Sequence, residues 1–269
     1  MTDEHLEAKQ REIRRRAGLV ELPCRDCGRL TWQEPHTGTE PVCGPCKRQA
    51  EQRERQARHE KIENARVALE QSRREEAERQ RQAYLRAVRA DIGTYQSHCG
   101  VARRWQGWTF DKCTAIPAKI LTAAKRWAED PDGLFVLMGP PGCGKTSLSV
   151  AVLAHLLCEG LATSNCKYLP ESEFLAACRE CKNGPSEFGR FQFLIFDDLG
   201  SSRLTDWGAA TVAELIARRH GHKTPTAIST NLSLEELAVA VDSRTVSRLV
   251  EDRNVFSFGS KAEDLRVGR

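Results

Sequence analysis

Three short runs in the second half of the chain have the composition of buried β-strands. Residues 134–138 and 193–196 consist entirely of large apolar side chains, and residues 226–230 form a smaller, mixed run. Amphipathic stretches that fit helices lie between these runs, with Gly and Pro at several of the junctions. Because strands that alternate with helices are typical of α/β domains, we predict one such domain with a central parallel sheet over residues 101–269.

The first hundred residues lack comparable apolar runs. From Lys47 to about Arg89 the chain is dense in Arg, Glu, Gln and Ala and contains neither Gly nor Pro. These residues are good helix formers, so we predict a long charged helix or linker over residues 47–92.

The apolar content of this predicted helix is low. Ile62 and Leu69 are one heptad apart, but Glu76 and Ala83 occupy the next two equivalent positions, which favours a solvated helix over a dimeric coiled coil. We expect a partner protein to dock near the end of the helix, at Tyr84, Leu85 and Val88.

Composition and charge narrow the class of protein. The 269 residues are 40% apolar and 29% charged, which is typical of a globular protein with a strongly solvated part, and the net charge of +4 is too small to indicate a nucleic-acid partner by itself. No apolar run approaches the roughly 20 residues that cross a bilayer, and the first residues lack a secretion-signal pattern. We therefore expect a cytoplasmic protein without a membrane partner, whose eleven cysteines are thiols or metal ligands.

Two Cys-x-x-Cys pairs lie in the N-terminal segment 1–46: Cys24 with Cys27, and Cys43 with Cys46. Four thiolates at this spacing can surround one Zn²⁺ tetrahedrally, so we predict a structural zinc ribbon over about residues 20–46. His36 lies between the pairs and is an alternative ligand. A third pair, Cys178 and Cys181, has no second pair near it, and we predict that it has no function.

A phosphate-binding loop follows the first apolar run. Residues 139–147 match the pattern GxxxxGK[ST] and lead into a predicted helix from Ser147 to about Cys158, a setting in which backbone N–H groups surround phosphates. Lys145 supplies charge to the β- and γ-phosphates, and the Thr146 hydroxyl can ligate Mg²⁺. The predicted nucleotide-binding residues are Gly139, Pro140, Pro141, Gly142, Cys143, Gly144, Lys145, Thr146 and Ser147.

Polar side chains follow the other two apolar runs. Asp197 and Asp198 come directly after residues 193–196, and Asn231 comes directly after residues 226–230. Ligands of open α/β sheets bind at the carboxyl ends of the strands. We therefore expect Asp197 to hold Mg²⁺, Asp198 to orient and polarise the attacking water of an ATP hydrolase, and Asn231 to sense the γ-phosphate.

The order of these motifs resembles that of the AAA+ ATPases over most of residues 101–269. Among the AAA+ ATPases, this sequence is most similar to the DnaC-type loaders of replicative helicases and to the IstB-type transposition helpers. The stretches that carry the narrower resemblance are Trp108-Thr109-Phe110, Phe196-Asp197-Asp198-Leu199-Gly200, Asp206-Trp207, Arg218-Arg219, Thr224-Pro225-Thr226, Ser229-Thr230-Asn231 and Arg244-Thr245-Val246-Ser247-Arg248-Leu249.

This resemblance implies roles for further residues. Arg248 matches the position of an arginine finger, which acts on the nucleotide of a neighbouring subunit and so implies self-association into a ring or spiral; Arg244, one helical turn earlier, is the alternative finger. Arg266 resembles the sensor 2 residue. The chain departs from most AAA+ proteins at Asp198, where they have Glu. The implied catalytic set is Lys145, Asp197, Asp198, Asn231 and Arg248.

The resemblance also implies a function: an ATP-dependent loader that binds a hexameric replicative DNA helicase through its N-terminal region and delivers it to single-stranded DNA. ATP, Mg²⁺ and Zn²⁺ would be its cofactors. Two alternatives stay open, a transposition helper and a nucleic-acid-binding adaptor whose nucleotide site is only structural. A GTPase is disfavoured because the chain has no Asn-Lys-x-Asp stretch to recognise guanine.

Single-stranded DNA is held by basic side chains and by aromatic rings on which bases stack. The basic candidates are Lys182, Arg190 and Arg203, and Trp207 is a candidate stacking residue. The position of Trp207 at the start of a predicted amphipathic helix is, however, more typical of a core residue.

Overall fold

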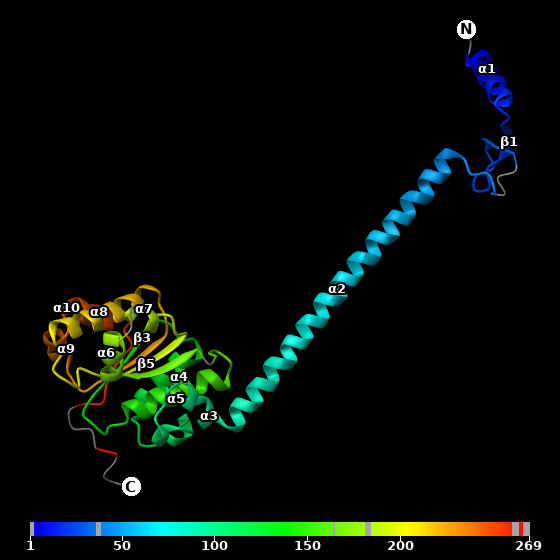
Figure 1. Ribbon diagram of the computed structural model, residues 1–269. Coiled ribbons are helices and arrows are strands. Elements are labelled where there is room, and N and C mark those ends of the chain that lie inside the picture. Colours follow the sequence, from blue (N-terminus) through cyan, green and yellow to red (C-terminus); the bar gives the residue numbers. More distant parts are fainter. Residues whose placement is uncertain (1–2, 36–38, 164, 181–183, 260–263, 266–269) are drawn as a thin grey trace. The chain divides into compact units, whose positions relative to one another are not determined.

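The computed structural model describes residues 3–35, 39–163, 165–180, 184–259 and 264–265. Contacts divide the chain into two compact units, an N-terminal unit, Met1–Arg79, and a C-terminal unit, Gln80–Arg269. Figure 1 shows both units and the long helix to which each contributes a part. In the described part of the chain, every helix lacks either the length or the apolar character that a membrane crossing requires.

The N-terminal unit begins with helix α1 (Asp3–Arg16), which was not predicted. A two-stranded antiparallel sheet follows, in which β1 (Val20–Pro23) pairs with β2 (Leu30–Gln33). Helix α2 (Gly44–Ala90) is 47 residues long and confirms the prediction of one long helix. It begins within the second cysteine pair, three residues before the predicted start at Lys47.

Along the part of α2 that belongs to the N-terminal unit, side chains face solvent. Ile62, Val67 and Leu69 are 45% to 61% exposed, and an ion pair of 2.8 Å joins Arg74 to Glu70 one turn earlier. Within this chain, that part of the helix is solvated.

The C-terminal unit is built on a parallel five-stranded sheet with the strand order β4-β5-β6-β3-β7. The strands are β3 (Leu134–Met138), β4 (Cys166–Pro170), β5 (Phe193–Leu199), β6 (Thr226–Thr230) and β7 (Val255–Ser257). The sequence analysis predicted β3, β5 and β6. It missed the two edge strands, β4 and β7, whose apolar runs are short or interrupted by polar residues. The predicted α/β class with a central parallel sheet is confirmed.

Helices cover both faces of the sheet. They are α3 (Ile92–His98), α4 (Ala118–Glu129), α5 (Lys145–Cys158), α6 (Glu171–Glu180), α7 (Pro185–Phe188), α8 (Asp206–Gly221), α9 (Leu234–Ala240) and α10 (Ser243–Glu251). Successive side chains of a strand point to opposite faces. Phe135 and Leu137 therefore pack with α4 and α5, whereas Leu134 and Val136 pack with α6 and α8. Figure 1 shows α3–α5 on one side of the sheet and α6–α10 on the other.

The last turns of α2 belong to the C-terminal unit, contrary to the expectation that they bind a partner protein. Val88 is completely buried and Leu85 is 6% exposed, and Tyr84 packs against the same core. Arg89 donates a hydrogen bond of 3.0 Å to the carbonyl oxygen of Cys158 at the end of α5. The apolar side chains that the sequence analysis assigned to docking are thus used to anchor the helix to its own chain.

Candidate functional site

The phosphate-binding loop joins β3 to α5 as predicted, and its backbone conformation requires glycine at two positions. Gly142 (φ 82°) and Gly144 (φ 103°) lie in the left-handed region that other residues rarely adopt. A Cβ atom at Gly144 would also come too close to the end of the Ile116 side chain, which would have to shift. The loop is thereby held tightly at the N-terminus of α5, where backbone N–H groups favour anions.

Lys145, the first residue of α5, is 5% exposed and reaches back over the loop. Its Nζ atom donates hydrogen bonds to the carbonyl oxygens of Gly139 (2.8 Å) and Pro140 (2.9 Å) and to Oδ1 of Asn231 (2.8 Å). Burial lowers the pKa of Lys145 from its usual value. All three acceptors are uncharged, so the positive charge is positioned in the loop without direct neutralisation by a carboxylate at these contacts.

Asp197 is 1% exposed and accepts hydrogen bonds from three hydroxyl groups on neighbouring elements. Thr146 Oγ1 lies 3.1 Å from Oδ1 and 3.0 Å from Oδ2, Tyr168 donates to Oδ2 at 2.6 Å, and Ser229 donates to Oδ1. Octahedral Mg²⁺ with bonds of about 2.1 Å brings neighbouring oxygen ligands about 3 Å apart. The Thr146–Asp197 pair fits that spacing, so these two residues suit a magnesium ion.

Asp198 and Asn231 complete the group of polar residues at the carboxyl ends of β5 and β6. The pairing of β5 with β6 is irregular between Phe196 and Leu199, and Asp198 has a positive φ of 57°, which directs it differently from its buried neighbour. Ser229 Oγ accepts a hydrogen bond of 3.0 Å from the backbone N–H of Asp198. Asp198 and Asn231 are both exposed.

The phosphate loop, Asp198 and Asn231 share a cavity of about 1170 Å³. Of the predicted nucleotide-site residues, it is lined by Pro141, Gly142, Gly144, Lys145, Thr146, Ser147, Asp198 and Asn231. The cavity is also lined by the segment before α4, whose lining residues include Arg104, Trp105, Trp108 and Lys112. The two tryptophan rings make an edge contact at 5.3 Å. The cavity combines a phosphate loop, polar strand ends and an apolar wall, and its size is suited to a nucleotide.

The two candidates for the arginine finger do not line this cavity in their own chain. Arg248 is half-buried and Arg244 is exposed on α10, and neither is among the described residues that line the cavity of their own chain. Arg266 lies outside the described residues, although Leu265 before it donates a backbone hydrogen bond of 3.1 Å to Gly142 O.

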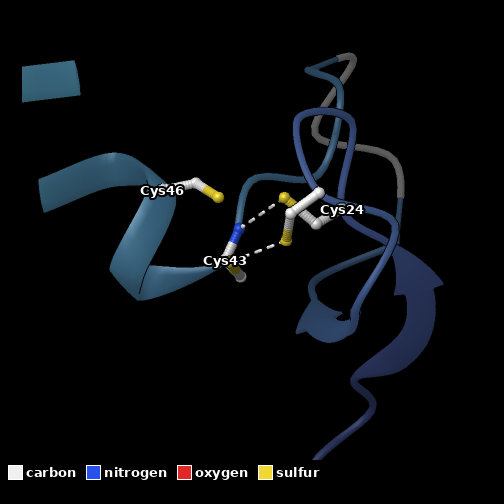
Figure 2. Close-up of side chains that lie close together, drawn as sticks. Cys24, Cys43 and Cys46 are labelled. Carbon is white, nitrogen blue, oxygen red and sulfur yellow. Dashed lines mark hydrogen bonds between the residues drawn. The ribbon is translucent and has the colours of Figure 1, made fainter. Parts of the chain in front are cut away.

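The four cysteines of the N-terminal unit converge as predicted. One ligand atom from each of Cys24, Cys27, Cys43 and Cys46 lies within 4.8 Å of the others, and Figure 2 shows three of these side chains close together. Zinc–sulfur bonds of about 2.3 Å in a tetrahedron separate the sulfurs by about 3.8 Å, so the cluster fits Zn²⁺. The backbone N–H of Cys43 donates to Cys24 Sγ at 3.3 Å and lowers the pKa of that thiol to about 6, which favours the thiolate that a metal binds.

The other candidates from the sequence do not join this cluster among the described residues. His36 and Cys181 lie outside the described residues, and Cys178 is buried in the C-terminal unit.

The expectation that Trp207 is a core residue is wrong. Trp207 is 43% exposed at the start of α8, and the guanidinium carbon of Arg179 lies 5.3 Å from the centre of its ring. Arg190 and Arg203 are exposed, and Lys182 lies outside the described residues. The helix keeps its buried face without Trp207 because Thr211, Val212 and Leu215 supply it.

Tyr168 is the residue of the site that sequence reasoning missed most clearly. It lies on an unpredicted edge strand, and an isolated tyrosine in a mixed run carries no signal of a polar contact. Arg104 and Trp105 were also missed, although the neighbouring Trp108 belongs to a stretch that the resemblance included. These residues reach the site through tertiary packing, which no local pattern records.

The structure has the features of a P-loop nucleotide-binding protein. A glycine-rich loop and Lys145 follow β3 of the parallel sheet, and the Asp197 carboxylate lies on β5, which is separated from β3 by one strand. The chain belongs to the family described as "IstB-like ATP binding protein", whose sequence profile matches residues 48–258. The family assignment made from the motifs is thus confirmed.

The individual relatives share only a low sequence identity with this chain. The replicative helicase loader DnaC of Escherichia coli (strain K12) is 24% identical over 140 residues, which cover 48% of this chain and 56% of the relative. The match therefore spans about half of that protein. Among solved structures, the DnaC helicase loader is 23% identical, with a TM-score of 0.49, over 58% of this chain and 98% of that one. DnaI is 17% identical, also with a TM-score of 0.49, over 62% and 94%.

Proposed function

We propose that this protein is an ATPase that hydrolyses ATP at the cavity between the phosphate loop and the ends of β5 and β6. The observation that carries the proposal is the convergence of Lys145, Thr146, Asp197 and Asn231, joined by hydrogen bonds of 2.8 to 3.1 Å although they lie on three separate strand ends. Membership of an ATP-binding family supports ATP as the nucleotide.

Each residue has a distinct role in the proposed reaction. The loop, Gly139 to Ser147, surrounds the phosphates, and Lys145 exchanges its neutral partners for phosphate oxygens. Thr146 and Asp197 hold Mg²⁺, which neutralises phosphate charge when it is bound. Asp198 orients and polarises the attacking water, and Asn231 contacts the γ-phosphate. Trp105 and Trp108 supply an apolar wall against which a base can pack.

Substitution of Asp198 tests this assignment. Asp198→Asn keeps the size of the side chain but removes the base, so we expect ATP to bind with unchanged affinity while turnover is lost. Hydrolysis by Asp198→Asn at the wild-type rate would refute the role of Asp198.

We further propose that Arg248 acts on the site of a neighbouring subunit and that Arg266 contributes to the site as sensor 2. The position of Arg248, away from the cavity of its own chain, supports action between subunits. A mixture of Arg248→Ala and Asp198→Asn chains, each inactive alone, should regain part of the turnover because one subunit supplies the base and its neighbour supplies the arginine. The same mixture made with Arg244→Ala tests the alternative finger, and a mixture of Arg248→Ala and Asp198→Asn that stays inactive would contradict the proposal.

The cellular role that the site and the relatives support best is that of a replicative helicase loader. The similarity to a protein named as a replicative helicase loader supports this role. The cysteine cluster, with bound Zn²⁺, and the solvated part of α2 would form the arm that binds the helicase. Purified chain mixed with a hexameric helicase should form a complex whose mass changes with ATP. Binding to a transposase and duplex DNA instead would favour the transposition helper, and absence of turnover would favour the adaptor.

Single-stranded DNA is the proposed nucleic-acid partner. The exposed Trp207 ring with Arg179 beside it offers a stacking surface and a cation on neighbouring helices. Binding to an oligonucleotide should weaken steeply with salt, as expected when phosphate contacts dominate.

A further inference from the structure

Glu171 is a fully buried acid beside the proposed hydrolytic site. It is the first residue of α6, directly after β4, and it is 0% exposed. β4 pairs with β5 in a register that sets Pro170 opposite Asp197, so Glu171 follows at the same end of the sheet as the two acids of the site. Nothing in the proposed reaction uses this residue so far.

Both carboxylate oxygens of Glu171 are used to hold the loop after β5. Oε2 accepts a hydrogen bond of 2.5 Å from the backbone N–H of Gly200, and Oε1 accepts one of 3.1 Å from the hydroxyl of Ser202. Burial raises the pKa of Glu171, while these two donors favour its charged form. A buried acid is costly unless its hydrogen bonds are satisfied, and the loop supplies them.

The loop that Glu171 holds begins directly after the end of β5, where the proposed base, Asp198, lies. Asp198 adopts its positive φ two residues before Gly200, and both Asp198 and Ser201 line the nucleotide cavity. On its other side the loop is fixed to β6, because Thr230 Oγ1 donates a hydrogen bond of 2.7 Å to the carbonyl oxygen of Leu199. Glu171, directly after β4, and Thr230, the last residue of β6, therefore hold the loop from the two sides of β5.

We propose that Glu171 is a positioning residue of the ATPase site, which fixes the loop after β5 and thereby the end of the strand, so that Asp198 is presented to the nucleotide. This inference rests on the proposed ATPase function. We expect this role to depend on the length of the Glu171 side chain rather than on its charge. The carboxylate oxygens must reach the Gly200 N–H and the Ser202 hydroxyl to hold the loop.

Two conservative variants separate length from charge. Glu171→Asp keeps the charge but withdraws the carboxylate by one methylene, and we expect kcat of the full-length chain to fall about 10- to 100-fold, the usual cost of misplacing a catalytic group. Glu171→Gln keeps the length, accepts from Gly200 and donates to Ser202, so its kcat should stay within about threefold of wild type. The dissociation constant for ATP should stay unchanged in both, because neither Lys145 nor the phosphate loop contacts Glu171 in the described interactions.

Glu173→Asp is the matched control, since Glu173 is exposed on the same helix and should tolerate the change. A wild-type kcat in Glu171→Asp, a larger loss in Glu171→Gln than in Glu171→Asp, or a parallel loss of ATP affinity would each overturn the inference. If the wild-type chain itself binds ATP without turnover, the proposed function fails and the inference falls with it; if the wild type turns over, these outcomes concern Glu171 alone.

Discussion

Removal of the Tyr168 hydroxyl tests whether Asp197 is held by the network that the structure contains. Tyr168→Phe deletes one oxygen and leaves the ring in place, so it creates almost no cavity in a side chain that is only 7% exposed. The lost contact is the 2.6 Å hydrogen bond to Asp197 Oδ2. The carboxylate retains its contacts with Ser229 and Thr146, so the change removes one of three donors.

The expected magnitude follows from the kind of bond. A hydrogen bond to a charged group contributes about 1.5 to 3 kcal/mol, and the free energy of unfolding should fall by that amount. For a urea dependence of about 2 kcal/mol per M, the midpoint of unfolding should fall by about 1 M. Urea titration of the full-length chain without Mg²⁺, followed by tryptophan fluorescence, measures this shift.

Tyr84→Phe is the matched control for this measurement. The Tyr84 hydroxyl is also buried, but it has no hydrogen-bond partner among the described residues. Its removal should leave stability unchanged or slightly raise it, since a buried polar group without a partner is costly. The reasoning would be refuted if both phenylalanine variants shifted the midpoint equally, because the Asp197 contact would then contribute nothing of its own.

Other predictions concern the remaining parts of the molecule. Val88→Ala should destabilise the C-terminal unit by about 2 kcal/mol in thermal or urea unfolding, whereas Val67→Ala, at an exposed position of the same helix, should be nearly neutral. Chelation of zinc, or Cys43→Ser, should unfold the ribbon as seen by proteolysis of residues 20–46 while ATP turnover by the C-terminal unit continues; an intact ribbon in the chelated chain would contradict this. Trp207→Ala should weaken binding of a single-stranded oligonucleotide about 10-fold or more with the salt slope unchanged, whereas an equal affinity would exclude stacking on this ring.

Most residues of the nucleotide site could be predicted from the sequence, but most residues that hold them in place could not. The phosphate loop, the acid pair and the asparagine could be predicted because each lies next to a strongly apolar run, and parallel strands bring their carboxyl ends together. The cysteine cluster could be predicted from spacing alone. Arg104, Tyr168 and Glu171 could not, since they come from the segment before α4, from an edge strand without a periodic pattern and from the first position of a helix.

The two wrong expectations have a common physical origin. Val88 and its neighbours on α2 were assigned to a partner because an isolated charged helix offers no other use for them, yet the C-terminal unit covers them. Trp207 was expected in the core because it lies at the start of an amphipathic helix, yet it is 43% exposed. In both cases the helix itself was predicted correctly. Which of its side chains are buried depends on tertiary packing, which the pattern along the helix does not determine.

The central claim is that ATP with Mg²⁺ binds at the phosphate loop through the charge of Lys145. Calorimetric titration of ATP and Mg²⁺ into the full-length chain tests it directly, with Lys145→Ala as the comparison. We expect one binding event per wild-type chain and an affinity at least about tenfold lower in the variant, the loss expected for a hydrogen-bonded charge. Equal affinities, or no heat from the wild type, would contradict it.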